Sequence, residues 1–279
     1  MRLAKRYNTE ISSSDSRQVY REMRIGTAVP EPEQLQAVKH HFIHTHSVYD
    51  YFSSWECEQQ TLSLLEKLFQ QKDQVLLVGG SMMYIDAICN GIDEIPTIDE
   101  QLRKEVFQQY EAEGLEAMRR QLKILDPVFY EQVDLKNAKR VIHAVEICLM
   151  AGKSYSELRS NTKKERNFNI VKIGLNRERE ELYHRINQRV DIMMQQGLEA
   201  EARALFPHRE LNALNTVGYK ELFEYFAGNI SLEKAVELIK RNSRRYAKRQ
   251  LSWFRRDKTI NWFNPEDYDA IVDCIDKQL

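Results

Sequence analysis

A short apolar run that ends in two glycines and leads into a helical segment constrains the fold most strongly. Residues 74–78 are rich in β-forming side chains, Gly79 and Gly80 follow them, and residues 81–90 have helical character. A strand that turns directly into a helix is typical of parallel sheets, whose strands are joined by helical crossovers. Similar β-rich runs alternate with helical periodicity elsewhere, at residues 9–14, 168–175 and 259–263. We therefore expect an α/β fold built on a parallel sheet.

One stretch of the chain carries no strand signal and predicts a separate group of helices. Residues 98–136 are charged and helical, with a break at Asp126-Pro127. We interpret this stretch as a helical insertion, so that residues 1–97 and 137–279 together form the core.

The C-terminal part of the chain predicts two long amphipathic helices, at residues 180–205 and 231–256, with a turn-rich segment between them at 207–218. Within the second helix, residues 239–250 contain no acidic side chain. Arginines recur there at a spacing of four, as Arg241, Arg245 and Arg249. Like charges at that spacing destabilise a helix, which favours an anionic partner. Nucleic-acid phosphates fit the charge, and the neighbouring aromatic side chains can stack on unpaired bases.

The overall composition excludes some classes of function. The 279 residues carry 41 basic and 42 acidic side chains, so the formal net charge of −1 points to no particular partner. The 4 cysteines form no C-x-x-C pair, which argues against a zinc site and favours reduced thiols in the cytoplasm. No apolar run is long enough to cross a membrane, and the first residues lead into no apolar signal core. We therefore expect a cytoplasmic protein without a membrane partner.

Asp15 and the segment Gly79-Gly80-Ser81 both follow predicted strands. Ligands bind at the carboxyl ends of the strands in open parallel sheets, so these residues are expected to face one crevice. The glycines permit a close backbone approach, and a helix that begins at Ser81 presents free N–H groups to an anion. Simpler structural roles remain open, because an aspartate can cap a turn and two glycines can serve only a tight turn.

Two other motifs suggest chemistry that their context does not support. Gly152-Lys153-Ser154 resembles the end of a phosphate-binding loop, but it follows a helical run at residues 139–149 and no strand. We interpret it as a helix end and a turn. Nearby histidines could suggest a metal site, and they are His40, His41, His44 and His46. No carboxylate or cysteine accompanies them at a typical ligand spacing, so we assign no metal ligands.

Taken in order, the motifs resemble those of the tRNA dimethylallyltransferase family. The resemblance runs from Leu3 to about Phe263. Its most specific segments are Asp15-Ser16-Arg17-Gln18-Val19-Tyr20, Ile25-Gly26-Thr27-Ala28, Val78-Gly79-Gly80-Ser81, Val217-Gly218-Tyr219-Lys220-Glu221 and Arg244-Arg245-Tyr246-Ala247-Lys248-Arg249-Gln250. The resemblance implies a parallel sheet like that of P-loop NTPases, with a helical insertion and C-terminal helices that bind tRNA.

The resemblance also implies an activity. Members of the family transfer a dimethylallyl group from dimethylallyl diphosphate to N6 of adenosine 37, beside the tRNA anticodon. The exocyclic amine of adenine is a poor nucleophile, so a carboxylate that accepts its proton assists the attack. Asp15 matches the family's general base. Ser81 and Arg189 match residues that contact the diphosphate, whose growing charge also requires Mg²⁺.

Contacts with the anticodon stem-loop of tRNA are implied for a further set of residues. They are Asp15, Ser16, Arg17, Gln18, Arg140, Arg244, Arg245, Lys248 and Arg249. The target base must leave its stack to reach the site, and cationic contacts with phosphates make the affinity fall with salt. We expect the protein to act as a monomer.

The sequence departs from the family pattern at its start. Family members begin with a strand and a loop of the type G-P-T-x-x-G-K-[ST], whereas residues 1–7 match the helix that follows this loop. We therefore expect the first strand and the P-loop to be absent, with unpaired sheet edges and weak donor binding as the result. Two smaller departures are Met82-Met83 in place of Gly-Leu, which narrows the donor pocket, and His143 in place of an arginine.

Two other functions stay open at this point. A degenerate paralogue would bind tRNA without catalysis. A small-molecule kinase would need the phosphate-binding loop and would leave the basic helix unexplained.

Overall fold

The computed structural model describes residues 1–159 and 162–279, which divide into two compact units. The sheet unit comprises Met1–Cys89 and Arg166–Leu279, and the helical unit comprises Asn90–Glu165. The helical unit is larger than the insertion expected at 98–136. Its extra C-terminal part contains a long helix that contributes Val141, Ala144 and Val145 to the helical unit's own apolar cluster, so this segment packs with the insertion.

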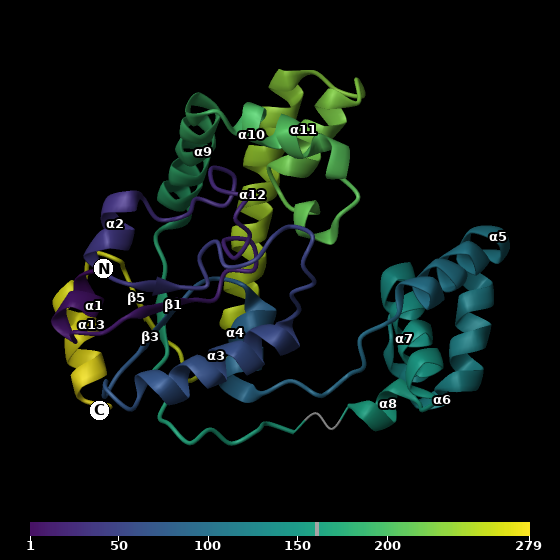
Figure 1. Ribbon diagram of the computed structural model, residues 1–279, viewed down its shortest axis with the longest axis horizontal. Helices are drawn as coiled ribbons and strands as arrows, with labels where there is room; N and C mark the ends of the chain where they lie inside the picture. The colour runs from purple at the N-terminus through teal and green to yellow at the C-terminus, as the bar shows by residue number, and fades with distance from the viewer. Residues whose placement is uncertain (160–161) are drawn as a thin grey trace. The chain divides into compact units, whose positions relative to one another are not determined.

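Five short strands form two parallel sheets in the sheet unit (Figure 1). In the first sheet, β1 (Ile11–Ser13) lies between β2 (His40–His41) and β3 (Leu76–Val78). In the second, β4 (Ile173–Leu175) pairs with β5 (Asn261–Phe263). The four strands expected from the sequence are confirmed, although each is shorter than its β-rich run. Strand β2 was not expected, because two residues carry no periodic signal.

The two sheets leave strand edges without partners in the described part of the chain. Strand β3 pairs only with β1, and β4 pairs only with β5. Val78 and Leu175, at the ends of these strands, are 53% and 55% exposed. Apolar strand residues are normally covered on both faces in parallel sheets. The unpaired edges expected from the sequence are therefore present. The strands form two separate sheets, whereas a single sheet was expected.

Helices alternate with the strands in the N-terminal part of the sheet unit. They are α1 (Arg2–Arg6), α2 (Pro32–Ala37), α3 (Ser54–Leu68) and α4 (Met82–Asn90). Helix α3 begins with a capping box, in which the Ser53 hydroxyl accepts the N–H of Glu56 and the Glu56 carboxylate accepts the N–H of Ser53. The last helix, α13 (Tyr268–Asp276), binds α1 through Arg6 and Tyr7, which both donate to Asp276 at 2.9 and 2.7 Å.

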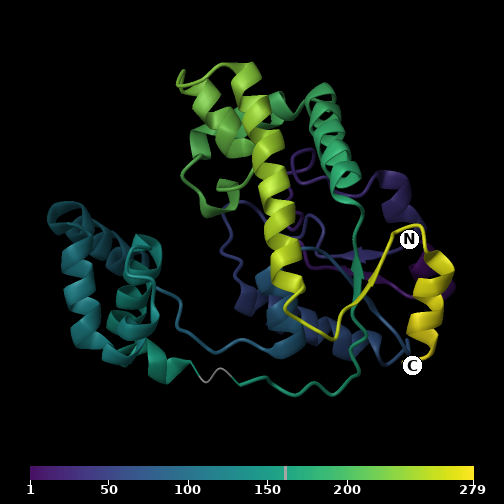
Figure 2. The same ribbon diagram turned by 180° about the vertical axis from the view of Figure 1, so that it is seen from behind.

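The C-terminal half of the sheet unit consists mainly of helices. They are α9 (Arg179–Gln196), α10 (Leu198–Leu205), α11 (Tyr219–Phe226) and α12 (Leu232–Phe254). The turn-rich segment between α10 and α11 contains two short helical turns, Phe206–His208 and Asn212–Leu214. Helices α9 and α12 pack against each other, as the view from behind also shows (Figure 2).

The single helix expected at 180–205 is in fact two helices. Gly197 has φ 103°, a left-handed conformation that ends α9 and redirects the chain into α10. The sequence pattern missed this break because the apolar periodicity continues across it. The start of α12 agrees with expectation, since the Ser231 hydroxyl accepts the N–H of Lys234 as an N-cap.

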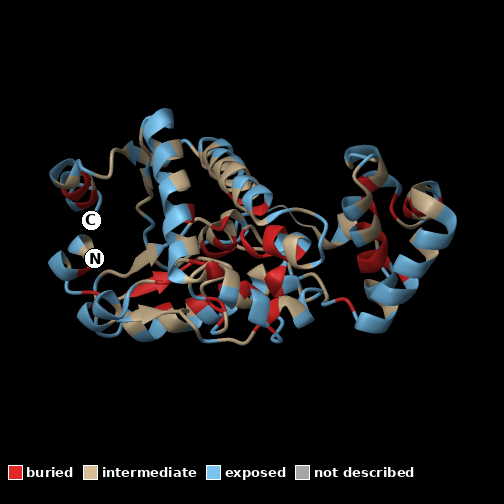
Figure 3. Ribbon diagram, turned by 90° about the horizontal axis from the view of Figure 1, so that it is seen from above, coloured by how far each residue is buried: buried red, intermediate tan, exposed pale blue. Residues whose placement is uncertain are grey.

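One large apolar cluster joins these helices to the ends of the first sheet. Its most deeply buried side chains include Met23, Leu198, Tyr219, Leu222 and Ile239. Figure 3 shows buried positions within both units. Because Met23 belongs to the loop after β1, the cluster holds the carboxyl end of that strand against α10, α11 and α12.

In its described residues, the helical unit contains α5 (Glu100–Leu125), α6 (Pro127–Gln132), α7 (Ala138–Ala151) and α8 (Tyr155–Leu158). Gly114, with φ 75°, is non-helical and divides α5 into two helical segments at a kink. The break expected at Asp126-Pro127 is confirmed. The Asp126 carboxylate caps α6 by accepting the N–H of Phe129 at 2.9 Å, and it also accepts the N–H of Ser156 at 2.7 Å. Gly152 has φ 63° and ends α7, so the expected helix end is confirmed there. In the described residues, no helix combines the length and the apolar character needed to cross a bilayer.

Candidate functional site

The turn after β1 holds one oxygen of the Asp15 carboxylate and leaves the other free. Asp15 Oδ1 accepts the backbone N–H of Arg17 at 2.8 Å and that of Gln18 at 3.1 Å. This is the turn role that an aspartate can play. The described residues provide no hydrogen bond to Oδ2. The structural and the functional readings of Asp15 are therefore compatible, because the turn uses only one of its two oxygens.

The carboxyl ends of β1 and β3 meet beside this turn. The Ser81 hydroxyl follows β3, is 6% exposed, and accepts the backbone N–H of Ser16 at 2.8 Å. Residues 14 and 78 are also linked directly, since the Ser14 N–H donates to the Val78 carbonyl at 2.8 Å. Asp15 and Ser81 thus lie on adjoining turns at the ends of two neighbouring strands, and the crevice expected between them stays a prediction.

Gly79 and Gly80 allow other groups to approach the backbone closely, but these groups belong to the protein itself. A Cβ at Gly79 would collide with the side chain and backbone of Ser14, and a Cβ at Gly80 would collide with the Gln250 side chain. Gln250 lies on α12, and its Nε2 donates to the Gly80 carbonyl at 2.8 Å. The glycines therefore bring β1, the turn after β3 and α12 together.

Tyr246, on α12, interacts with both Ser81 and Asp15. Burial raises the pKa of its hydroxyl, and the negative charge of Asp15 raises it further, while a hydrogen bond with Ser81 opposes the shift. The Tyr246 hydroxyl therefore lies close to both Ser81 and Asp15. The motif of residues 244–250 contains Tyr246, but it did not predict this position for its hydroxyl. The spacing of four between Tyr246 and Gln250 was the available signal, since it puts both on one helix face.

Arg189, on α9, carries a cation that interacts with the charge of Asp15. Its side chain is exposed to solvent, yet enough protein surrounds it that desolvation lowers its pKa, while the charge of Asp15 opposes this shift. A guanidinium stays protonated in proteins despite such a shift. No described residue forms an ion pair or a hydrogen bond with Arg189. Its charge is therefore available to an anionic ligand in the crevice.

The basic residues of α12 fall into two groups. Arg245, Lys248 and Arg249 are exposed. Arg244 is half-buried and joins α12 to α9, because its Nη1 donates to Asn187 Oδ1 at 2.6 Å and its guanidinium lies 6.0 Å from the Tyr183 ring centroid. The helical period of 3.6 residues puts Arg245 and Lys248 on the side of α12 away from Gln250, and Arg249 between the two sides.

Gln18 has a structural role in this region. Its side-chain amide donates to the carbonyls of Thr27 and Ala28 at 3.2 and 3.0 Å. Arg17 and Ser16 belong to the same turn and are partly exposed. Arg140 lies in the helical unit, where it is exposed on the first turn of α7 and Asn137 caps its N–H at 3.3 Å. Contacts of these residues with tRNA stay predictions.

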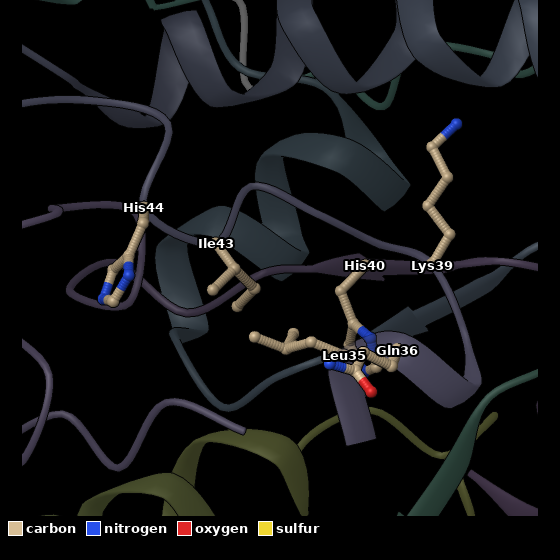
Figure 4. A pocket seen from close by; sticks show the side chains of 6 residues that line it. All are labelled: Leu35, Gln36, Lys39, His40, Ile43 and His44. Carbon is tan, nitrogen blue, oxygen red and sulfur yellow. The ribbon is translucent and has the colours of Figure 1, made fainter. Parts of the chain in front are cut away.

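A separate cavity of about 350 Å³ lies beside β2 and is lined by Leu35, Gln36, Lys39, His40, Ile43 and His44 (Figure 4). None of the expected site residues lines it. The neighbouring His41 is paired through Nε2 with Glu10 at 2.6 Å. In the described ranges 1–159 and 162–279, no three His, Cys, Asp or Glu side chains are grouped to hold a metal ion.

Comparison with known proteins identifies the family of this chain. The model of the IPP transferase family matches residues 18–257. The chain belongs to the IPP transferase family. It is 54% identical over all 279 of its residues to tRNA dimethylallyltransferase 1 of Bacteroides fragilis, of which the match covers 93%. It is also 56% identical over 264 residues to tRNA dimethylallyltransferase 2 of Porphyromonas gingivalis, covering 95% of this chain and 88% of that protein.

Solved structures of the same family share the fold. The full-length tRNA isopentenylpyrophosphate transferase of Bacillus halodurans is 35% identical, with a TM-score of 0.69 over 99% of this chain and 91% of that one. A eukaryotic dimethylallyltransferase acting on tRNA is 24% identical and has a TM-score of 0.74 over 90% of this chain and 65% of that one, which shows the fold alone. The family resemblance and the α/β fold expected from the sequence are therefore confirmed, and the chain is a transferase.

Proposed function

We propose that the chain transfers a dimethylallyl group from dimethylallyl diphosphate to N6 of adenosine 37, beside the anticodon of tRNA. The names of its relatives support this activity. The observation that carries the proposal is the arrangement of Asp15, whose Oδ1 is fixed by two backbone N–H groups while Oδ2 is free. Ser81 adjoins the Asp15 turn, and Tyr246 and Arg189 lie within the electrostatic influence of Asp15.

Asp15 acts as the general base in this proposal. As N6 of the adenine attacks C1 of the dimethylallyl group, a C–N bond forms and the C–O bond to the diphosphate breaks. The amine loses a proton in the same process, and Asp15 Oδ2 accepts it. A fixed carboxylate at this point contributes about 10²- to 10⁴-fold to the rate. The two N–H groups on Oδ1 hold the carboxylate in one orientation, and they leave Oδ2 to accept the proton.

Arg189 and Ser81 bind the diphosphate. The leaving group gains negative charge as the C–O bond breaks, and fixed donors stabilise that charge in the transition state. Arg189 supplies a guanidinium without an ion-pair partner among the described residues. The Ser81 hydroxyl accepts the N–H of Ser16, which leaves its own proton for a substrate oxygen or for Tyr246.

Mg²⁺ fits this site as an ion that accompanies the diphosphate. Magnesium at phosphate sites needs only one or two protein oxygens, with water and phosphate oxygens completing the octahedron. The Ser81 hydroxyl is the oxygen that would hold the ion, because Oδ2 of Asp15 is assigned to the proton from N6 and Oδ1 accepts two backbone N–H groups. When bound, Mg²⁺ would neutralise charge on the departing diphosphate.

Two groups of residues bind the anticodon stem-loop in our proposal. Arg245, Lys248 and Arg249 present exposed cations on α12 to the phosphates, and the turn of Ser16, Arg17 and Gln18 borders the flipped adenosine. Arg244 contributes indirectly, since it fixes α12 on α9 through Asn187. Arg140 contributes a further exposed cation from the helical unit.

We also propose that the enzyme works in the cytoplasm as a monomer. All four cysteines are free, and Cys57 and Cys148 are buried, which suits a reducing compartment. Light scattering of the purified protein should give the mass of one chain, and in the presence of tRNA the mass of one chain plus one tRNA; the mass of two chains would contradict the monomer.

Mass spectrometry of tRNA nucleosides tests the proposed reaction. The protein is incubated with unmodified tRNA, dimethylallyl diphosphate and Mg²⁺. The expected product is adenosine with one dimethylallyl group on N6. A transcript with guanosine at the same position is the matched control and should stay unmodified. Tight binding of the tRNA with no product at any donor concentration would contradict the proposal and favour a paralogue that binds without catalysis.

A further inference from the structure

Glu201 on α10 collects four hydrogen-bond donors. Its Oε2 accepts the backbone N–H groups of Arg24 and Ile25 at 3.0 and 2.8 Å, and its Oε1 accepts the N–H of Gly26 at 3.0 Å. The Tyr219 hydroxyl donates to Oε1 at 2.6 Å. A carboxylate has about four lone-pair sites, so Glu201 is saturated. Three successive N–H groups that converge on one anion form a nest, and the anion here is part of the protein.

The loop that Glu201 holds has no freedom to move away. A Cβ at Gly26 would collide with the Tyr219 ring, so glycine is needed for this contact. Burial raises the pKa of the Tyr219 hydroxyl and the charge of Glu201 raises it further, which keeps the hydroxyl protonated as a donor. The Thr27 hydroxyl closes the loop on itself by donating to the Met23 carbonyl at 2.7 Å.

The same loop connects to the Asp15 turn through Gln18. Ala28 has φ 48°, a left-handed conformation that is unfavourable for a residue with a Cβ, and its carbonyl accepts the amide of Gln18 at 3.0 Å. The Gln18 amide also donates to Thr27, and the Gln18 backbone N–H donates to Asp15 Oδ1. Strained backbone of this kind persists only where the surroundings fix it, often beside a functional group.

We propose that Glu201 is a positioning residue for the reaction, acting through residues 24–28 and Gln18 on the orientation of the Asp15 carboxylate. Glu201 touches no substrate in this account. It fixes the loop, the loop fixes the Gln18 side chain, and Gln18 fixes the turn in which Asp15 Oδ2 stays free. The inference rests on the proposed role of Asp15 as general base.

Hydrogen exchange distinguishes this role from local support of the loop. Glu201→Gln keeps the shape of the side chain but places an NH₂ group against N–H donors. Exchange should become about 10-fold faster or more at residues 24–28, and also at residues 15–18, because both segments depend on the same contacts. Glu199→Gln, on the same helix and paired only with exposed Arg203, is the matched control and should change neither segment. Faster exchange at 24–28 alone would overturn the proposal.

Gln18→Met tests the connection between the two segments. Methionine has a similar length but cannot donate to Thr27 or Ala28. In this background Glu201→Gln should still loosen residues 24–28, and it should have no additional effect on residues 15–18. An equal additional effect in both backgrounds would show that Glu201 acts by another route and would overturn the proposal.

Turnover of the full-length protein provides the functional readout. Glu201→Gln should lower kcat by about 10- to 100-fold, as expected for a small misplacement of a reacting group, with the KM for tRNA within a few-fold of the unaltered enzyme. Tyr219→Phe removes one of the four donors and should give a smaller loss in the same direction, which keeps the test possible if Glu201→Gln folds poorly. An unchanged kcat in both variants would refute the positioning role. Asp15→Asn, measured in parallel, separates the two claims: if it also retains full turnover, the proposed general base is what has failed.

Discussion

At the scale of single residues, two glycines lie where the sequence motif predicts a close approach, but what approaches them is part of the protein. Gly79-Gly80 was expected to allow close approach to an anion. In the structure, the space is used by Ser14 for the first glycine and by Gln250 for the second. The two contacts differ in kind. Gly79 lies against the backbone and side chain of Ser14, whereas Gly80 lies against the end of the flexible Gln250 side chain.

This difference predicts unequal effects of two alanine substitutions. Gly79→Ala places a methyl group against the backbone of Ser14 and should cost about 1–3 kcal/mol of unfolding free energy, as overpacking does. Gly80→Ala should cost less, because the Gln250 side chain can move aside. Urea unfolding of both variants measures the difference. Equal losses would mean that the backbone at Ser14 yields as easily as a side chain.

At the scale of elements, the sequence located most helices and strands but not every boundary. The Ser231 cap and the Asp126-Pro127 break follow from side chains that hydrogen-bond their own backbone, which a sequence displays directly. The division at Gly197 could not be read, because a glycine within an amphipathic pattern is often tolerated in a helix. The contact of the Tyr246 hydroxyl with Ser81, under the charge of Asp15, could not be predicted, because no local pattern shows which way this side chain points.

The end of α12 is tied to the chain before β4 by an ion pair with a predictable pH dependence. Burial alone would raise the pKa of Asp257, but hydrogen bonds from Lys172 and Thr259 lower it to about 2. Lys172 Nζ lies 2.6 Å from the carboxylate. A carboxyl pKa that is lower in the folded state stabilises the fold above its unfolded value near 3.8, and this stability is lost as the pH falls towards 2. Asp257→Asn should therefore cost up to about 2 kcal/mol at pH 7 and nearly nothing at pH 2. Unfolding free energies at both pH values check this, and a pH-independent cost would contradict it.

The cationic face of α12 predicts a salt-dependent interaction. Arg245→Glu combined with Arg249→Glu should weaken tRNA binding. The slope of the logarithm of the binding constant against the logarithm of the salt concentration should become shallower by about 1 for each phosphate contact that is lost. Lys67→Glu combined with Lys277→Glu changes the net charge equally at exposed sites on other helices and is the matched control. Filter binding over a range of salt concentrations measures both slopes. Equal affinities and slopes for the two double variants would exclude α12 as the tRNA-binding surface.

At the scale of the whole molecule, each unit has an apolar core of its own. The α/β class and a helical insertion were predictable, because strand and helix periodicities differ along the chain. The extent of the helical unit was not predictable, because the apolar periodicity of α7 would be the same if this helix packed on the core of the sheet unit. The split of the sheet into two was not predictable either, since no local signal in β3 or β4 indicates it.

Separate cores predict that the helical unit can open by itself. The Asp126 carboxylate is fully buried and accepts three hydrogen bonds, from the Phe129 N–H and from the N–H and hydroxyl of Ser156. Asp126→Ala should leave these donors unpaired and cost about 2–3 kcal/mol within residues 90–165. Hydrogen exchange should accelerate there and stay unchanged at residues 198–254. Uniform acceleration over both units would show that they unfold as one.

The rate of dimethylallyl transfer by Asp15→Asn tests the central claim most directly. Asparagine keeps the size of the side chain and an oxygen for the N–H groups of Arg17 and Gln18, but it cannot take a proton from N6. Under single-turnover conditions with saturating tRNA and donor, the account predicts a rate at least about 100-fold below that of the unaltered full-length enzyme, with the tRNA affinity unchanged within a few-fold. A transfer rate equal to that of the unaltered enzyme would contradict it.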